Sequence, residues 1–369
     1  MPYTHFRLIA YEVHTASSKR FNPVRSGWDP GNECPAVARL PVPATVPDDA
    51  RIRLKRLASV VDLATTQVSA GGRADDVNTL KVFLVPEFYL RPPASIGTDY
   101  KGSTYPVKVG TQVLDALNKM FVAADFADWL FVCGTLMWNT LADTKAEPLY
   151  FNTAIVVRGG RADALHVLEK RIPSDKDGIP APTAPDKSEG EYAGPGYDPT
   201  VKLFFDQWSE RKRHILVFDG ISFGVEVCLD HFDNRLCRVL RRLLVDWGTN
   251  EAVIPAPAVQ LHVLTAGGMD IMERCVCAKV DGYIMRNDGM MTASEPAASE
   301  MRQVQSYARS DGSGPVGPSD DDATAALGAR VTPQYVPIPN GAQQVPPPGD
   351  PYLAIPQQRL AFYPVTPMP

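Results

Sequence analysis

HILVFDGISFGVEVCLDH, residues 214–231, contains two short apolar runs in tandem. The runs His214–Asp219 and Phe223–Leu229 are rich in β-branched and aromatic residues, which is typical of strands. Asp219-Gly220 between them favours a tight hairpin, because both residue types accept positive φ angles. The sequence therefore predicts an antiparallel pair. The chain is predicted to leave the sheet at Cys228, where the second strand ends.

Apolar runs of the same kind recur along the chain, with helical stripes between several of them. Further strands are predicted at Phe6–Val13, Leu80–Val85, Leu130–Leu136, Phe151–Val157, Val167–Ile172, Ala252–Ile254 and Tyr283–Arg286. Helices are predicted over 54–68, 114–124, 236–247 and 269–280. Strands that alternate with helices indicate an α/β protein. Because some strands follow one another directly, we expect mixed rather than purely parallel sheets.

Two regions depart from this pattern. Residues 173–200 are polar and rich in Pro and Gly, which predicts a long loop that shapes a pocket. The tail from about Ser310 holds 13 of the 34 prolines, so we expect neither a helix nor a central strand there. It retains apolar residues, as in RLAFYPV (359–365), which predicts an extended arm packed on its own body or on a neighbour. The predicted organisation is a domain over 1–310 and a proline-rich C-terminal arm over 311–369.

Composition excludes several classes of protein. A net charge of −5 gives no electrostatic reason to expect a nucleic acid partner. No apolar run approaches the ~18 residues of a membrane span, and the N-terminus lacks a secretory leader pattern, so no membrane association and a cytoplasmic location are expected. The six cysteines are scattered and form no C-x-x-C pair, which predicts reduced thiols. His231 and His262 lack metal-ligand spacing, so neither a metal nor another cofactor is predicted.

Three residues with useful chemistry stand at predicted strand ends. Glu87 follows the strand 80–85, Lys170 ends the strand before Pro173, and Cys228 ends the strand described above. A thiol can attack an amide or nitrile carbon, a carboxylate can take the thiol proton, and an ammonium can stabilise the negative charge that develops. Each residue also has an ordinary interpretation: a buried core cysteine, a strand-end surface charge and a solvated lysine.

The blocks around these residues resemble the signature of the nitrilase superfamily. VPE (85–87), LEKRIP (168–173) and GVEVCLD (224–230) occur in that order, with 83 residues from Glu87 to Lys170 and 58 from Lys170 to Cys228. Three flanking stretches add to the resemblance: FVCGTL (131–136), YFNTAIVVRGG (150–160) and VCAKVDGYIMRNDG (276–289), the last as a helix followed by a strand. The resemblance implies a four-layer α-β-β-α sandwich with mixed sheets, carrying here an extended proline-rich C-terminal arm. It also implies a homodimer or a higher homo-oligomer.

The same resemblance implies hydrolysis of a non-peptide carbon–nitrogen bond through a thioester, with Glu87 as base, Lys170 as stabilising cation and Cys228 as nucleophile. Asp230 favours an amide or carbamoyl substrate over a nitrile, because nitrilases more often have Glu at that place. Two alternatives stay open. The thioester could pass to an amine in an acyl transfer, or the fold could serve a non-catalytic binding protein that uses its proline-rich tail.

The sequence departs from the family pattern where a second active-site carboxylate is expected. The carboxylates nearest to the GTL-like strand are Asp143 and Glu147, and Glu226 is another option because a period of two places it on the face of Cys228. The candidate substrate-binding residues are Glu147, Leu229, Asp230 and His231.

One further motif, Gly220-Ile-Ser-Phe-Gly224, fits the G-x-S-x-G elbow of serine hydrolases. That elbow requires a strand before the serine and a helix after it. Here a second strand follows, so the motif is interpreted as part of the hairpin.

Overall fold

The structure of the chain is a computed structural model. It describes residues 3–15, 43–69, 77–92, 102–140, 150–162, 164–170, 172, 214–234, 236–237, 258–290, 298–309, 311, 314, 316–317, 322–338 and 358–369. The predicted loop 173–200, the predicted strand 252–254 and most of the predicted helix 236–247 lie outside these residues.

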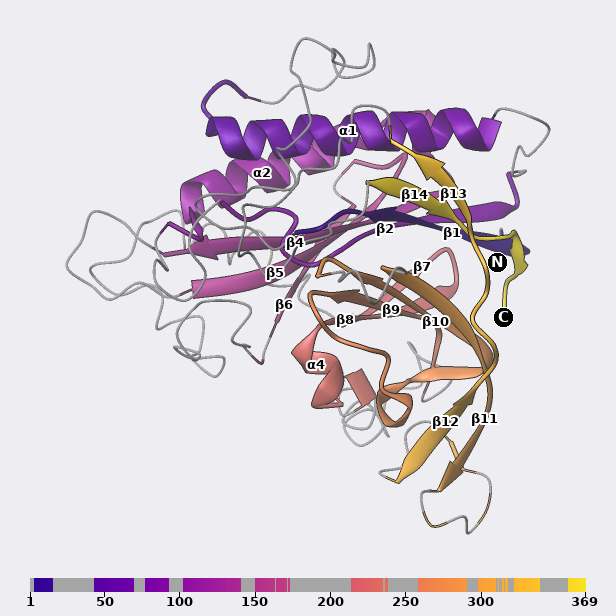
Figure 1. The fold of residues 1–369 in the computed structure, drawn as a ribbon. Helices are drawn as coiled ribbons and strands as arrows, with labels where there is room; N and C mark the ends of the chain where they lie inside the picture. The colour runs from indigo at the N-terminus through magenta and orange to yellow at the C-terminus, as the bar shows by residue number, and fades with distance from the viewer. Residues whose placement is uncertain are drawn as a thin grey trace, which may run out of the picture.

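The first of two stacked sheets is built mainly from the N-terminal half of the chain (Figure 1). Its strands are β1 (His5–Glu12), β2 (Thr79–Val85), β3 (Tyr105–Pro106), β4 (Trp129–Asn139), β5 (Tyr150–Arg158), β6 (Leu165–Glu169), β13 (Gln334–Pro337), β14 (Arg359–Phe362) and β15 (Thr366–Pro367). The main order is β13-β14-β1-β2-β4-β5-β6, with β15 on β1 and β3 on β4. Strands β1, β2 and β4 run parallel, whereas β5 and β6 are antiparallel, so the sheet is mixed as predicted.

The second sheet has the order β12-β11-β10-β9-β8-β7. Its strands are β7 (Ile215–Phe218), β8 (Ile221–Val227), β9 (Val259–Ala266), β10 (Ala278–Asp288), β11 (Ser299–Arg309) and β12 (Ala323–Leu327). It is also mixed, because β8, β9 and β10 are parallel while β7 and β11 are antiparallel to their neighbours. The predicted hairpin is confirmed: Asp219 has φ 53° and Gly220 φ 80°. The strand β8 runs through the G-x-S-x-G motif, so the elbow interpretation does not apply.

Two long helices, α1 (Asp48–Ser69) and α2 (Val107–Met120), cover the outer face of the first sheet (Figure 1). Their buried stripes include Leu54 and Leu57 of α1 and Leu114 of α2, which pack with the outward residues of β1, β2 and β4. Shorter helical elements among the described residues include the 3₁₀ turns η3 (Ala124–Phe126) and η6 (Glu273–Cys275) and the short α4 (Leu229–Phe232). Within the described residues, no helix is long and apolar enough to cross a membrane.

The inner faces of the two sheets share one apolar core. In β1, Phe6 and Leu8 face this core, while Ile9 and Tyr11 face the helices, as the period of two requires. The buried amide of Asn287 joins the sheets, because its Nδ2 donates to the carbonyl oxygens of Tyr11 (2.9 Å) and Leu84 (2.7 Å). These contacts hold the carboxyl ends of strands from both sheets together.

The predicted helix over 269–280, and with it the helix at the start of 276–289, is wrong. Residues 278–288 form β10, which pairs with β9 on one side and β11 on the other. The helical spacing of Met269, Met272, Val276 and Val280 was misleading, because only the short 3₁₀ turn η6 forms among these residues, and Val280 lies in β10, where it is 45% exposed. The strand β9 itself was not predicted.

The expectation that the tail contains no central strand is also wrong. Strand β14 lies between β13 and β1 and is paired with both. The residues of the pairing, Arg359–Phe362, contain no proline, since the nearest prolines are Pro356 and Pro364. Ladder hydrogen bonds are therefore available on both sides. The strands after residue 310 join both sheets, β12 the second and β13–β15 the first.

The prediction that all cysteines are reduced is wrong for one pair. Cys237 and Cys277 form a disulfide, with their Cα atoms 5.7 Å apart. Forty residues separate them, so sequence spacing gave no signal; the fold brings the segment after α4 against the start of β10.

Candidate active site

The two charged residues predicted from strand ends meet in the interior. Lys170 Nζ donates to Glu87 Oε1 at 3.0 Å, and both side chains are buried, with exposures of 1% and 0%. Asn152 of β5 donates from Nδ2 to the same oxygen at 2.8 Å, and its carbonyl oxygen accepts the Lys170 backbone N–H at 2.8 Å. One carboxylate oxygen therefore receives two donors from neighbouring strands, which fixes the orientation of Glu87.

The backbone around Glu87 is held from several sides. Its N–H donates to the carbonyl oxygen of Ala266 (3.3 Å), and its own carbonyl oxygen accepts the Thr15 hydroxyl (2.6 Å). Phe88, which follows, has a positive φ of 63°, and its N–H donates to Thr135 Oγ1 at 2.9 Å. A positive φ in a bulky residue needs such support, which is common at functional sites.

Cys228 stands where β8 turns into α4. It has φ 47° and ψ −109°, is 3% exposed, and donates its N–H to the carbonyl oxygen of Thr265 at 3.0 Å. Its Sγ lies 4.0 Å from the carbonyl oxygen of Gly267. The thiol therefore lies beside the residue that follows β9 and is buried from the solvent.

Gly267 connects the thiol with the carboxylate. A Cβ at this position would lie 2.9 Å from Glu87 Oε2 and 2.6 Å from the Phe88 ring, so only glycine leaves room for them. The same residue contacts both Glu87 and Cys228, and this brings the carboxylate and the thiol to one place. Sequence reasoning missed Gly267, although the Gly267-Gly268 pair after an apolar run is a signal for a turn.

The other cysteines that the structure describes as free are Cys133 and Cys275. Burial raises the pKa of Cys133 strongly, and burial raises the pKa of Cys275 to about 11. Their thiolates are therefore scarce at neutral pH, which makes both poor nucleophiles.

The four predicted substrate-binding residues differ in their burial and in their contacts. Asp230 is fully buried and accepts the Ile172 N–H on Oδ1 at 2.8 Å, which ties the turn after Cys228 to the strand end that carries Lys170. Leu229 is half-buried at the start of α4. His231 is fully buried with both ring nitrogens engaged by the protein. Glu147 lies outside the described residues.

Glu226 does not share the face of Cys228, so that expectation is wrong. Val225, Val227 and Cys228 belong to the core between the sheets, whereas Glu226 points to the opposite face and accepts the Leu236 N–H at 2.6 Å. Alternation along the strand ends at Val227, because the positive φ of Cys228 turns its side chain inward.

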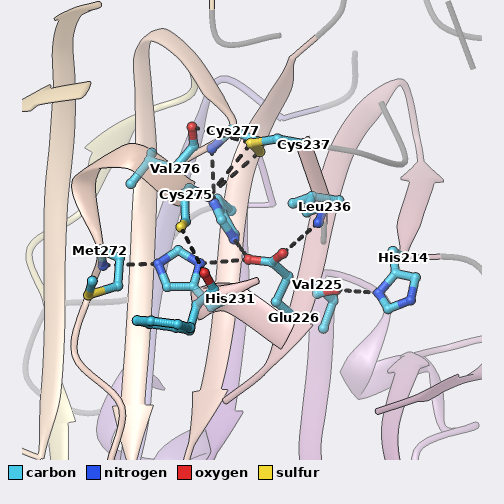
Figure 2. A network of polar contacts seen from close by, with 12 residues as sticks. His214, Val225, Glu226, His231, Leu236, Cys237, Met272, Cys275, Val276 and Cys277 are labelled. Atoms are coloured by element: carbon cyan, nitrogen blue, oxygen red, sulfur yellow. Dashed lines mark hydrogen bonds and ion pairs between the residues drawn. A yellow bond between two sulfur atoms is a disulfide. The ribbon is translucent and has the colours of Figure 1, made fainter. Parts of the chain in front are cut away.

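The spacing of His231 and His262 gave no sign of a metal site, yet the fold places the ligand atoms of both histidines and of Glu226 within 4.8 Å of one another. Oε2 of Glu226 contacts His231 Nδ1 at 2.6 Å and His262 Nε2 at 2.9 Å (Figure 2). The far ring nitrogens accept backbone N–H groups, His231 Nε2 from Met272 and His262 Nδ1 from Cys277. Both imidazoles must then donate to Glu226, so the cluster is satisfied by its own hydrogen bonds and does not fit a metal.

The pKa shifts in this cluster agree with a charged Glu226 that accepts hydrogen bonds from both imidazoles. Burial opposes the charge on Glu226, yet hydrogen bonds from His231 and His262 lower its pKa to about 2. Burial lowers the pKa of His262, which keeps the imidazole neutral despite the neighbouring carboxylate.

No protein-family model matches the sequence, and no curated protein matches it. Among solved structures, the chain is similar to Nit3 from Saccharomyces cerevisiae, a member of branch 10 of the nitrilase superfamily, with 12% identity over 89% of this chain and 91% of that chain, at a TM-score of 0.39. It is similar to an amidase from Nesterenkonia sp., with 12% identity over 88% of both chains, at a TM-score of 0.36. These values are too low to assign a family or an activity.

Proposed function

We propose that the chain is a thiol hydrolase of the nitrilase type that cleaves a non-peptide carbon–nitrogen bond in a small amide or carbamoyl compound. The observation that carries the proposal is the buried ion pair of Lys170 and Glu87, which shares Gly267 as a neighbour with the thiol of Cys228. A buried ion pair is a weak source of stability, because desolvation offsets most of the attraction. Its place beside a strand-end thiol therefore favours a catalytic role.

The residues divide the reaction between them. Glu87 takes the proton from Cys228 Sγ as the sulfur attacks the carbonyl carbon of the substrate. Lys170 stabilises the oxyanion of the tetrahedral intermediate. The intermediate collapses to a thioester, and the protonated Glu87 returns its proton to the departing amine or ammonia. Glu87 then takes a proton from water, which attacks the thioester. As the acid is released, the protonated Glu87 returns this proton to the departing sulfur, and the free thiol and the carboxylate are restored.

Asn152 supports these roles, because it donates to Glu87 Oε1, the oxygen that also accepts from Lys170. With Oε1 engaged by two donors, the proton is transferred at Oε2, the oxygen that lies beside Gly267. The same geometry keeps the lysine ammonium next to the carboxylate until an oxyanion competes for it.

Intact-mass analysis after incubation with a panel of amides, carbamoyl compounds and nitriles tests the proposal. We expect an acyl adduct on the wild type that accumulates at early times, and no adduct on Cys228→Ala. Cys275→Ala, which removes another buried thiol, serves as the control and should still form the adduct. A thioester that persists in water but passes to an added amine would indicate acyl transfer, and the absence of any adduct across the panel would support a non-catalytic binding protein.

A further inference from the structure

Glu226 links the chain before Cys228 to the chain after it. Its Oε2 accepts from His231 Nδ1 at 2.6 Å, and its Oε1 accepts from the Leu236 N–H at 2.6 Å. Both partners follow Cys228 in sequence, whereas Glu226 precedes it. The carboxylate therefore closes a loop around Cys228 from the outer face of the second sheet, as Figure 2 shows for Glu226 between His231 and Leu236.

The backbone conformation of Cys228 needs such a closure. A φ of 47° with a ψ of −109° is sparsely populated for a residue with a side chain. Conformations of this kind persist only where the surroundings over-determine them. Direct support comes from two hydrogen bonds, the Cys228 N–H to the Thr265 carbonyl oxygen at 3.0 Å and the His231 N–H to the Cys228 carbonyl oxygen at 2.9 Å. The second of these bonds depends on where His231 is held.

His231 is held at both ring nitrogens. The Met272 N–H donates to Nε2 at 3.0 Å, so in the neutral ring the proton is on Nδ1 and is donated to Glu226. His262 of β9 donates to the same carboxylate oxygen from the side, at 2.9 Å. Three donors on one buried carboxylate leave Glu226 little freedom, and they fix the position of α4 relative to β8.

We propose that Glu226 and His231 form a clasp that holds Cys228 in its reactive conformation, and that both are positioning residues rather than substrate-binding residues. The inference rests on the proposed role of Cys228 as nucleophile. When the clasp opens, Cys228 is free to return to an ordinary φ, and its Sγ moves away from Gly267 and from Glu87 Oε2. The thiol then loses its base, although the sheets and the core between them stay intact.

Three variants of the full chain separate the clasp from general stability. Glu226→Gln places an amide NH₂ against either the Leu236 N–H or the imidazole N–H groups, so a donor faces a donor. His231→Leu removes the Nδ1 donor at similar volume. His231→Asn keeps a donor close to the position of Nδ1 and is the conservative rescue. Asp219→Asn is the control, because this carboxylate also accepts several hydrogen bonds but lies at the opposite end of β8, beside Arg158 and Arg161.

The rate of iodoacetamide labelling at Cys228, read by peptide mass, is the measurement, with the melting temperature recorded for each variant. We expect labelling about 10-fold slower or more in Glu226→Gln and His231→Leu, since small misplacement of a reacting group is costly. His231→Asn and Asp219→Asn should label close to the wild-type rate. Equal rates in Glu226→Gln and wild type, or equal slowing in both His231 variants, would overturn the proposal.

The remaining outcomes separate failure of the clasp from failure of the proposed function. If His231→Leu does not fold while His231→Asn does, the contact is a stability element and the positioning role is rejected. If Cys228 in the wild type labels no faster than Cys275, the proposed function fails instead. A reactive Cys228 that none of the variants affects removes the clasp alone.

Discussion

Lys170 and Glu87, 83 residues apart in the chain, form an ion pair of 3.0 Å between the ends of β6 and β2, with both side chains buried. Their pairing beside Gly267, which also contacts Cys228, brings a carboxylate, an ammonium and a thiol together in the interior.

Cys228 should react first with iodoacetamide at neutral pH. Glu87 can accept its proton, whereas burial raises the pKa of Cys133 strongly and that of Cys275 to about 11. Peptide mass mapping of the folded protein at short times gives the order of labelling. Faster labelling of Cys133 or Cys275 would show that the nucleophile is assigned wrongly.

Glu87→Gln should lose most turnover and keep its fold. An amide cannot accept the thiol proton, and loss of a positioned base typically lowers the rate about 10²–10⁴-fold. The matched control is Glu12→Gln. Glu12 is another buried carboxylate of the first sheet, bonded to Ser299 and Arg359. The control should lower the melting temperature yet retain turnover while folded; near-full activity of Glu87→Gln would remove this residue from the mechanism.

Stability should fall on acidification, partly through Glu226. Its pKa is about 2 against an ordinary 4.5, so between these values the unfolded state binds more protons than the folded state. The stabilisation is complete above pH 4.5 and is lost as the pH falls through about 2; its size is on the order of 3 kcal/mol. Urea unfolding of wild type and Glu226→Gln at pH 7, 5 and 3 measures it. Parallel curves for the two proteins would contradict the assignment.

Leu360→Ala should destabilise the protein by about 2–5 kcal/mol, as expected for a leucine buried in a core. Leu360 is fully buried in β14, opposite Tyr11 of β1, and packs with the helices of the first sheet. Val365→Ala, at a residue that is 38% exposed, is the control and should cost far less. Truncation after Gly328 should have a larger effect than either change. Unchanged melting with rapid proteolysis of the tail would show that these strands do not hold the sheet together.

The disulfide should contribute to stability as well. Cys237→Ser combined with Cys277→Ser should lower the free energy of unfolding by roughly 2–4 kcal/mol, because the link closes a long loop in the unfolded chain. Intact mass with and without a reductant, after alkylation under denaturing conditions, counts the thiols directly. If all six cysteines alkylate without reduction, the pair is a dithiol in solution.

Much of this architecture was predictable from local patterns. The hairpin at Asp219-Gly220 and the pairing of β5 with β6 follow from tandem strand signals and turn residues, which act over short distances. The stripe of α1 was predictable for the same reason. The predicted strand Tyr283–Arg286 lies within β10, but the segment before it was mistaken for a helix, because its apolar residues fall at helical spacing. The segment RLAFYPV (359–365) was expected to pack on the body, but its central place in the sheet was not predicted, because the prolines of the tail argued against a strand there.

The candidate site was predictable only in part. Glu87, Lys170 and Cys228 carry signals of their own at strand ends. The roles of Gly267 and Asn152 depend on how distant strands stack. The turn of the Cys228 side chain away from the face of Glu226 depends on a single φ angle. The pairing of His262 with Glu226 across 36 residues has no local signal at all.

Because the chain is synthesised from its N-terminus, β1 is made long before β14, its partner on one edge. Glu12 of β1 meets its partner Arg359 of β14 only 347 residues later, although β2 on the other side comes within the first 85. At typical synthesis rates that interval is about 20–70 s, during which one edge of β1 has no strand to pair with. An open edge is a template for contact with other nascent chains. Packing of α1 against the outer face of β1 and β2 covers a face and not this edge, which is closed only when β14 and β15 pair with it.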